Sequence, residues 1–118
     1  MKRLAATVLA VALAQPLAAQ TVSSAPGGQI RVLDKLNGTI TDLELRNGEP
    51  QTAGLLTVTL NECRYPAQNP SGDAFAELTV TYRDETPPAF EGWMIASSPA
   101  LNAMDHPRYD VWVLRCTV

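Results

Sequence analysis

A cluster of polar side chains near the C-terminus has the residue types that acyl transfer requires. Ser97 and Ser98 carry hydroxyls, His106 carries an imidazole base, and Asp105 and Asp110 carry carboxylates that could orient it. A nucleophile, a base and an orienting carboxylate are the parts of a serine hydrolase. The sequence has no Gly-x-Ser-x-Gly turn to expose a serine, however, and no evident oxyanion hole. A hydrolase is therefore the weakest of the functional hypotheses.

The same segment does not have the residues of a metal site. The chain has one histidine and two cysteines, which we expect to form a disulfide, so a zinc ligand set cannot be completed. Asp105 and Asp110 flank Pro107 and do not follow the spacing of a calcium loop. We expect no cofactor and no enzymatic activity.

Large aromatic side chains are the stronger candidates for function. In the expected strand at residues 109–116, Asp110 and Trp112 share one face, whereas Tyr109 points to the other. We expect at least one of Trp93 and Trp112 to pack in the core against the disulfide, as large aromatics do in small β domains. An exposed tryptophan would mark a contact site, because tryptophan, tyrosine and arginine dominate interface hot spots.

These aromatics and the loop before the last strand define a candidate contact surface, since binding residues often lie in loops on a rigid β scaffold. Its members are Trp93, Ser97, Ser98, Asn102, Asp105, His106, Arg108, Tyr109, Asp110 and Trp112.

Short runs of alternating polar and apolar residues must position this surface. They occupy residues 30–33, 39–45, 55–63, 75–82, 90–96 and 109–116. Asn37-Gly38 between the first two runs is a strong hairpin signal. Ser98 as N-cap and Pro99 at the first helical position predict a short helix that continues over residues 100–104. The pattern predicts a mainly β fold, a small antiparallel β-sandwich or barrel with one short helix and one disulfide.

The N-terminus has the layout of a secretory signal peptide. Lys2 and Arg3 precede an apolar run at residues 4–13, and small residues follow Pro16, so we expect cleavage after Ala19. The run is shorter than the roughly 20 residues that a membrane span needs. We therefore expect a periplasmic protein that does not span the membrane after cleavage.

Composition divides the rest of the chain and limits its partners. Residues 20–28 are small and polar and predict a flexible arm, followed by a single β domain at residues 29–118. Twelve acidic residues against nine basic ones give a net charge of −3, and removal of the signal peptide makes it more negative. Nucleic acid is not an expected partner, because its recognition requires a basic patch.

The two cysteines fit an oxidising compartment. Cys63 and Cys116 would close a loop of about 50 residues, and chain entropy gives such a bond up to about 4 kcal/mol of stabilisation. Two buried free thiols are the alternative, but the even count and the export signal favour the disulfide.

A long signature resembles a known family. Residues 92–102 read Gly-Trp-Met-Ile-Ala-Ser-Ser-Pro-Ala-Leu-Asn, and with the segments that follow they are similar to the core of DUF2155, a domain of unknown function in exported alphaproteobacterial proteins. The other matching segments are Asp105-His106-Pro107, Tyr109-Asp110-Val111-Trp112, Leu33-Asp34-Lys35, Asn37-Gly38, Cys63 and Cys116. The resemblance covers about residues 29–118. It implies periplasmic location and the disulfide, and it assigns no activity.

Three functions of different classes follow as expectations. The resemblance implies a gene that often lies beside one for an accessory subunit of the proton-pumping NADH:quinone oxidoreductase, and hence an accessory subunit or assembly factor of that complex. The first hypothesis is thus a non-enzymatic periplasmic interaction module that docks on an envelope or inner-membrane protein complex. The second is a periplasmic binder of a small ligand or carbohydrate, and the third is the Ser/His hydrolase.

Overall fold

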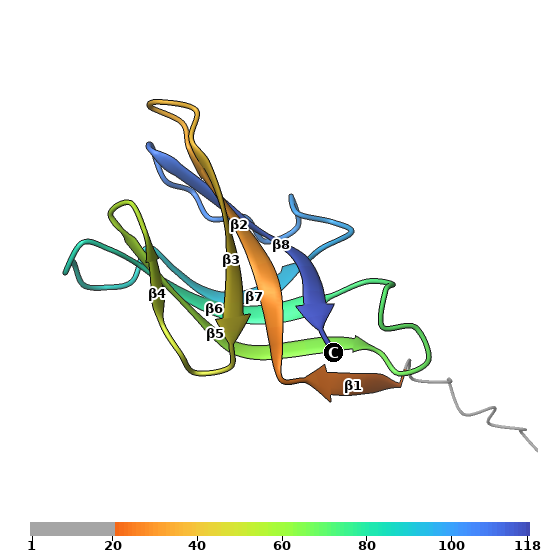
Figure 1. The fold of residues 1–118 in the computed structure, drawn as a ribbon. Coiled ribbons are helices and arrows are strands. Elements are labelled where there is room, and N and C mark those ends of the chain that lie inside the picture. Colours follow the sequence, from red (N-terminus) through yellow and green to blue (C-terminus); the bar gives the residue numbers. More distant parts are fainter. Residues whose placement is uncertain (1–20) are drawn as a thin grey trace, which may run out of the picture.

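The computed structural model describes residues 21–118, which form eight strands in two antiparallel sheets (Figure 1). The strands are β1 (Val22–Ala25), β2 (Gly27–Asp34), β3 (Ile40–Arg46), β4 (Gln51–Ala53), β5 (Leu56–Pro66), β6 (Phe75–Tyr82), β7 (Phe90–Ile95) and β8 (Tyr109–Thr117). A mainly β, antiparallel fold is therefore confirmed. The described strands do not close into a barrel.

The larger sheet has the order β1-β5-β6-β7, with β4 pairing β5 on the same side as β1, and the smaller sheet has the order β3-β2-β8. The strands of the smaller sheet run across those of the larger one (Figure 1). The predicted hairpin joins β2 to β3, and Gly38 at its turn has a φ of 76°, which glycine adopts at little cost.

Alternation along the strands builds one core between the sheets. Leu56, Val58 and Leu60 of β5 are fully buried, as their spacing predicted, and Leu78 and Val80 of β6 pack beside them. The smaller sheet contributes the inward-facing residues Ile30, Val32, Leu43, Leu45, Tyr109, Val111 and Val113. The opposite faces of both sheets carry polar residues and a few large side chains.

The predicted disulfide is present and joins the two sheets. Cys63 of β5 and Cys116 of β8 have a Cα–Cα distance of 5.8 Å, and both are buried. Gly28 of β2 lies against the bond, because a Cβ at this position would be 3.1 Å from the Cys63 Sγ atom. The backbone of β2 thus approaches β5 most closely at this end of the molecule.

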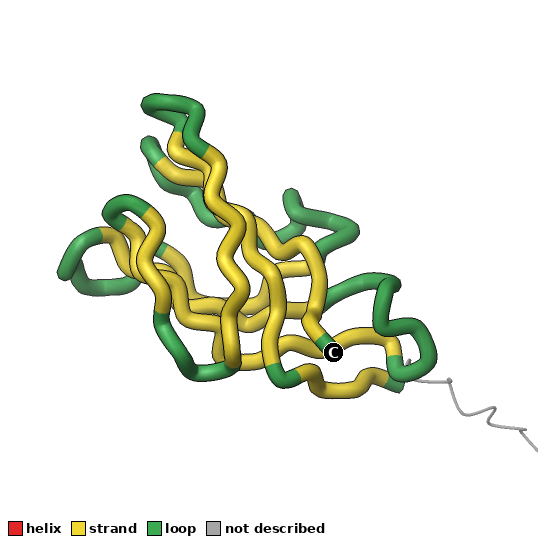
Figure 2. The backbone as a smooth tube through the Cα atoms, viewed as in Figure 1, coloured by secondary structure: helices red, strands yellow, loops and turns green. Residues whose placement is uncertain are grey.

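Two predictions about local structure are wrong. Residues 98–104 form turns, and the structure contains no helix within residues 21–118 (Figure 2). The segment is too short for a stable helix, and its polar groups bond to other parts of the chain instead. Most of the predicted arm at residues 20–28 is also ordered, since Val22–Ala25 pairs with β5 and Gly27 begins β2.

The predicted signal peptide, residues 1–19, lies outside the described residues. No helix in the described part of the chain is long and apolar enough to cross a membrane.

Candidate functional site

The loop between β7 and β8, residues 96–108, carries most of the predicted contact residues and is held at its start by Asp73. The Asp73 carboxylate accepts hydrogen bonds from the Ser97 backbone N–H at 2.9 Å, the Ser97 hydroxyl at 2.6 Å and the Ala74 N–H at 2.9 Å. Burial opposes ionisation of this carboxyl, but the three donors outweigh it and lower its pKa. Ser97 is therefore a structural anchor of the loop.

The middle of the loop is attached to β7 and to the core. The Asn102 side-chain amide donates to the Trp93 carbonyl oxygen at 2.7 Å, and Met104 is buried among the core residues. Ser98 is half-buried, and its backbone closes two turns, donating to Ile95 and accepting from Leu101. These contacts hold Leu101 at an exposed turn, where 73% of its surface is accessible.

Trp93 lies on the outer face of the larger sheet and is not part of the core. The residue is 36% exposed, and the Arg64 guanidinium lies over its ring, 5.1 Å from the centroid. Arg64 also donates to Glu62 at 2.6 Å. A shallow cavity of about 200 Å³ is lined by Trp93 and Arg64 together with Val22 and Phe75. Trp93 thus provides a partly exposed aromatic surface on this face, with Arg64 over its ring.

Trp112 lies on the outer face of the smaller sheet and is partly covered. It borders a groove of about 340 Å³ between β8 and the loop, together with Pro99, Ala103 and Met104. Neither tryptophan belongs to the buried core, so the predicted core tryptophan is wrong. Tyr109 takes that place instead: it is 1% exposed and does not belong to the outer contact surface.

Tyr109 connects the two sheets at the end opposite the disulfide. Its hydroxyl oxygen accepts a hydrogen bond from the Leu55 N–H at 3.1 Å, and Leu55 directly precedes β5. The rings of Tyr82 and His106 lie beside it, with centroids 6.1 and 5.8 Å from that of Tyr109. A Cβ on Gly54 would lie 2.6 Å from the Tyr109 oxygen, so this contact depends on glycine at position 54.

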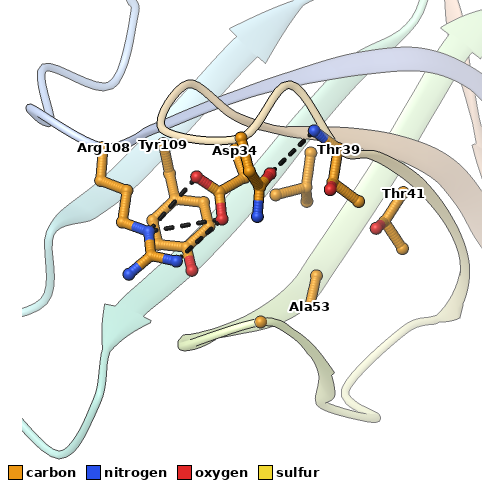
Figure 3. A pocket seen from close by; sticks show the side chains of 9 residues that line it. Asp34, Thr39, Thr41, Ala53, Arg108 and Tyr109 are labelled. Atoms are coloured by element: carbon orange, nitrogen blue, oxygen red, sulfur yellow. Dashed lines mark hydrogen bonds and ion pairs between the residues drawn. The ribbon is translucent and has the colours of Figure 1, made fainter.

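Arg108 forms a bidentate pair with the buried Asp34. The Arg108 Nη2 and Nε atoms donate to the Asp34 carboxylate at 3.0 and 3.3 Å, and the Leu36 N–H donates to it at 3.0 Å. The hydrogen bonds from Arg108 are the main reason that the pKa of Asp34 is lowered; burial acts in the opposite direction. Figure 3 shows the Arg108 side chain across the carboxylate and beside the Tyr109 ring.

This pair borders a cavity of about 210 Å³ between the β2–β3 hairpin and the turn before β5. Thr39 and Thr41 lie across the cavity from Arg108, and Ala53 lies on the side of the larger sheet (Figure 3). The space is concave and combines apolar walls with several polar groups, as small-molecule sites do.

The two main hydrolase candidates, Ser97 and His106, are hydrogen-bonded to different parts of the chain and not to each other. The Ser97 hydroxyl donates to Asp73, whereas the His106 Nδ1 atom accepts from the backbone N–H groups of Arg108 and Tyr109 at 3.1 and 3.2 Å. The His106 carbonyl oxygen is bound by the Lys35 ammonium at 2.7 Å. No hydrogen bond joins His106 to Ser97 or Ser98 in the described structure, so this arrangement lends no support to acyl transfer.

The remaining carboxylates of the segment are separate. Asp105 is exposed, and Asp110 is half-buried on the outer face of β8, with Lys35 3.5 Å from it. Within residues 21–118 no three His, Cys, Asp or Glu side chains are grouped to hold a metal.

Sequence reasoning missed Asp34, Asp73, Arg64 and Gly54. Asp34 lies in a segment that carries the family resemblance, which was the one available signal for its importance. Asp73 had no such signal, because its partner Ser97 is distant along the chain and the two meet only through the pairing of β6 with β7.

Comparison with known proteins identifies relatives without an assigned activity. The family model described as "Uncharacterized protein conserved in bacteria (DUF2155)" matches residues 28–116. The chain is similar to "Uncharacterized protein RP359" of Rickettsia prowazekii (strain Madrid E), with 32% identity over 92 residues, which are 75% of this chain. The match spans 59% of that relative's length. No solved structure matches the chain.

Proposed function

The chain belongs to the DUF2155 family of bacterial proteins, and within that family we propose that it is a periplasmic protein-interaction module without enzymatic activity. The observation that carries the proposal is the partly exposed Trp93, whose ring lies under the Arg64 guanidinium on the outer face of the larger sheet. Tryptophan and arginine are the residues that most often dominate binding energy at interfaces.

The loop at residues 96–108 supports the same proposal. Its anchoring by Asp73 and Asn102 fixes the backbone around Leu101, which keeps a large apolar side chain in solvent. An ordered loop loses little conformational entropy when it binds, so exposed apolar groups on it contribute more to affinity. Trp93 and this loop adjoin through the bond from Asn102 to the Trp93 carbonyl oxygen.

We infer that the partner is an envelope or inner-membrane protein complex, with the proton-pumping NADH:quinone oxidoreductase as the first candidate. The reason is the gene neighbourhood that the family resemblance implies. The role would be that of an accessory subunit or assembly factor, in contact through Trp93 and the loop.

A pull-down from gently solubilised native membranes tests the proposal. The wild-type protein with a tag after the exposed Val118 should recover subunits of one membrane complex in fixed ratio. Trp93→Ala should lose them, whereas Ile40→Ala, which removes an exposed apolar side chain from the smaller sheet, should retain them. Recovery of the tagged protein alone would count against an interaction module.

The cavity of about 200 Å³ beside Trp93 favours one alternative, a small-ligand or carbohydrate binder. Aromatic faces stack on sugar rings, and a concave surface beside one is what such a binder needs. Sugars that change tryptophan fluorescence in the wild type but not in Trp93→Phe would favour this alternative over docking on a protein.

A further inference from the structure

The cavity beside Asp34 and Arg108 lies between the two sheets and shares only Arg108, the last residue of the loop, with the surface proposed above, so an inference about it stands apart from the proposed function. Its volume is about 210 Å³, several times the roughly 30 Å³ that a water molecule occupies in the liquid. Both sheets supply its walls, with Thr39 and Thr41 on the smaller sheet and Ala53 and Gly54 on the larger (Figure 3).

The Tyr109 hydroxyl is an incompletely used hydrogen-bonding group in this wall. Its oxygen accepts from the Leu55 N–H, but within residues 21–118 nothing accepts the hydrogen of the hydroxyl itself. Tyr109 is 1% exposed, and a buried tyrosine hydroxyl ordinarily has an acceptor for its hydrogen. Because Tyr109 lines the cavity, a molecule bound there could supply the missing acceptor oxygen.

The charges around the cavity favour a neutral ligand. Arg108 and Asp34 neutralise each other, and the carboxylate oxygens of Asp34 are occupied by Arg108 and by the Leu36 N–H. A charged group entering this narrow space would lose its hydration and find no unpaired opposite charge. A neutral group with an acceptor oxygen meets no such penalty.

The other walls specify the rest of the ligand. The side chains of Thr39 and Thr41 carry hydroxyls that can accept a hydrogen bond, and Val32 and Ala53 present apolar surface. A group that combines a carbonyl oxygen, an N–H and a methyl matches these three features. That group is an acetamide.

We propose that this cavity binds the acetamido group of a neutral ligand, such as an N-acetylated amino sugar. The carbonyl oxygen accepts from the Tyr109 hydroxyl, the N–H donates to the Thr41 hydroxyl, and the methyl contacts Val32 and Ala53. Gly54 leaves the space that the Tyr109 hydroxyl occupies, so the site also depends on the absence of a side chain there.

An NMR titration of the ¹⁵N-labelled, disulfide-bonded protein tests the proposal. N-acetylglucosamine and acetamide should shift the amide signals of Leu55, Gly54 and Thr39 in a saturable way, and glucose should not. N-acetylalanine amide separates the two sources of the group: an equal response to it indicates acetamido recognition in general, and a weaker one indicates an amino sugar. Both outcomes uphold the site.

Two site variants and one control variant identify the site as the cause of the shifts. Thr41→Val keeps the shape of the side chain and should weaken binding about five-fold, the equivalent of one hydrogen bond. Thr59→Val makes the same change on the outer face of the larger sheet and should leave the affinity unchanged. Tyr109→Phe should abolish saturable shifts at Leu55.

Three results would overturn the proposal: no shift at these amides in the presence of excess N-acetylglucosamine, equal shifts with glucose, or shifts that map around Trp93 instead. Unaltered affinity in Thr41→Val, with the variant folded by its NMR spectrum, would overturn the assignment of the N–H partner.

Discussion

The two ends of the paired sheets are closed by different means. At one end the Cys63–Cys116 bond joins β5 to β8, and Gly28 lets the backbone of β2 pack directly against the sulfur. At the other end the Leu55 N–H of the larger sheet donates to Tyr109 of the smaller one, Arg108 pairs with Asp34 within the smaller sheet, and a cavity remains between the sheets. One end is covalent, although a cavity of about 370 Å³ borders it beside Gly27, Leu45 and Thr117, whereas the other end is polar and has its cavity between the sheets.

Within this small domain, the disulfide end supplies stability, and the opposite end keeps the space in which a ligand could bind. A chain of this size buries a limited core, so a covalent link at one end contributes a large share of the folding free energy. With that end secured, the other end can keep unfilled space and an incompletely bonded hydroxyl. Binding sites are commonly found in such less tightly packed regions.

The largest expected effect follows from removal of the covalent link. Replacement of both Cys63 and Cys116 by alanine should lower the free energy of unfolding by about 4 kcal/mol, because the cross-link no longer restricts the unfolded chain. Urea denaturation monitored by tryptophan fluorescence measures the loss. Reduction of the wild type with dithiothreitol is the matched control and should give a similar value. A loss below about 1 kcal/mol would show that close packing, and not the bond, secures this end.

A smaller loss in the free energy of unfolding is expected when a side chain is added at Gly28, beside the disulfide. A Cβ in Gly28→Ala would lie 3.0 Å from the Arg115 carbonyl oxygen and 3.1 Å from the Cys63 Sγ atom. Overpacking of this kind costs about 1–3 kcal/mol in the free energy of unfolding. The control is Gly48→Ala, where the added Cβ meets no atom within 4 Å and only the positive φ opposes it. A Gly28→Ala variant as stable as the wild type would contradict the tight fit at Gly28.

The sequence predicted the strands with a clear apolar alternation better than a strand that depends on its pairing alone. Residues 75–82 were predicted as a strand and are β6, because their alternation records which side chains face the core. The disulfide followed from the cysteine count and the export signal. β1 was missed because Val22–Ala25 has little apolar pattern of its own and is a strand only through its pairing with β5.

The candidate site was harder to predict because its contacts join distant parts of the chain. Asp34 and Arg108 are 74 residues apart, and no local pattern indicates such a pair. The alternation in β8 correctly separated Tyr109 from Trp112 but did not tell which face was the core. The preference for tryptophan as the larger apolar side chain led to the wrong choice, because burial of Tyr109 is favoured by the partner of its hydroxyl at Leu55.

Loss of the Tyr109 hydroxyl should lower the free energy of unfolding only modestly. Tyr109→Phe keeps the ring in the core but leaves the Leu55 N–H without its acceptor, at a cost of about 1–2 kcal/mol in the free energy of unfolding. Tyr82→Phe is the matched control: its ring lies beside that of Tyr109, and its hydroxyl forms no hydrogen bond within the described residues. If urea denaturation showed both variants to be as stable as the wild type, the hydrogen bond between Leu55 and Tyr109 would not contribute to holding the sheets together.

The contribution of the Asp34–Arg108 pair to stability should be present at neutral pH and be lost in acid. Hydrogen bonds from Arg108 lower the pKa of Asp34 in the folded state, so the folded state favours the ionised form. The resulting stability is present above the unfolded pKa, near 4, and is lost as the pH falls through the lower folded pKa. In Asp34→Asn the free energy of unfolding should therefore fall less steeply below about pH 4 than in the wild type.

Asp42 provides a comparison between an exposed carboxylate and the buried carboxylate of Asp34, each paired with a partly exposed arginine. It is paired with Arg31 on the outer face of the smaller sheet, and this hydrogen bond also lowers its pKa. Asp42→Asn should therefore reduce the acid-side slope as well. Salt at roughly 0.5 M screens exposed charges far more than buried ones, so it should remove the effect of Asp42→Asn but preserve that of Asp34→Asn. Equal screening of both effects would mean that water reaches Asp34 freely, and the end opposite the disulfide would then be open to solvent and too wet to select a neutral ligand.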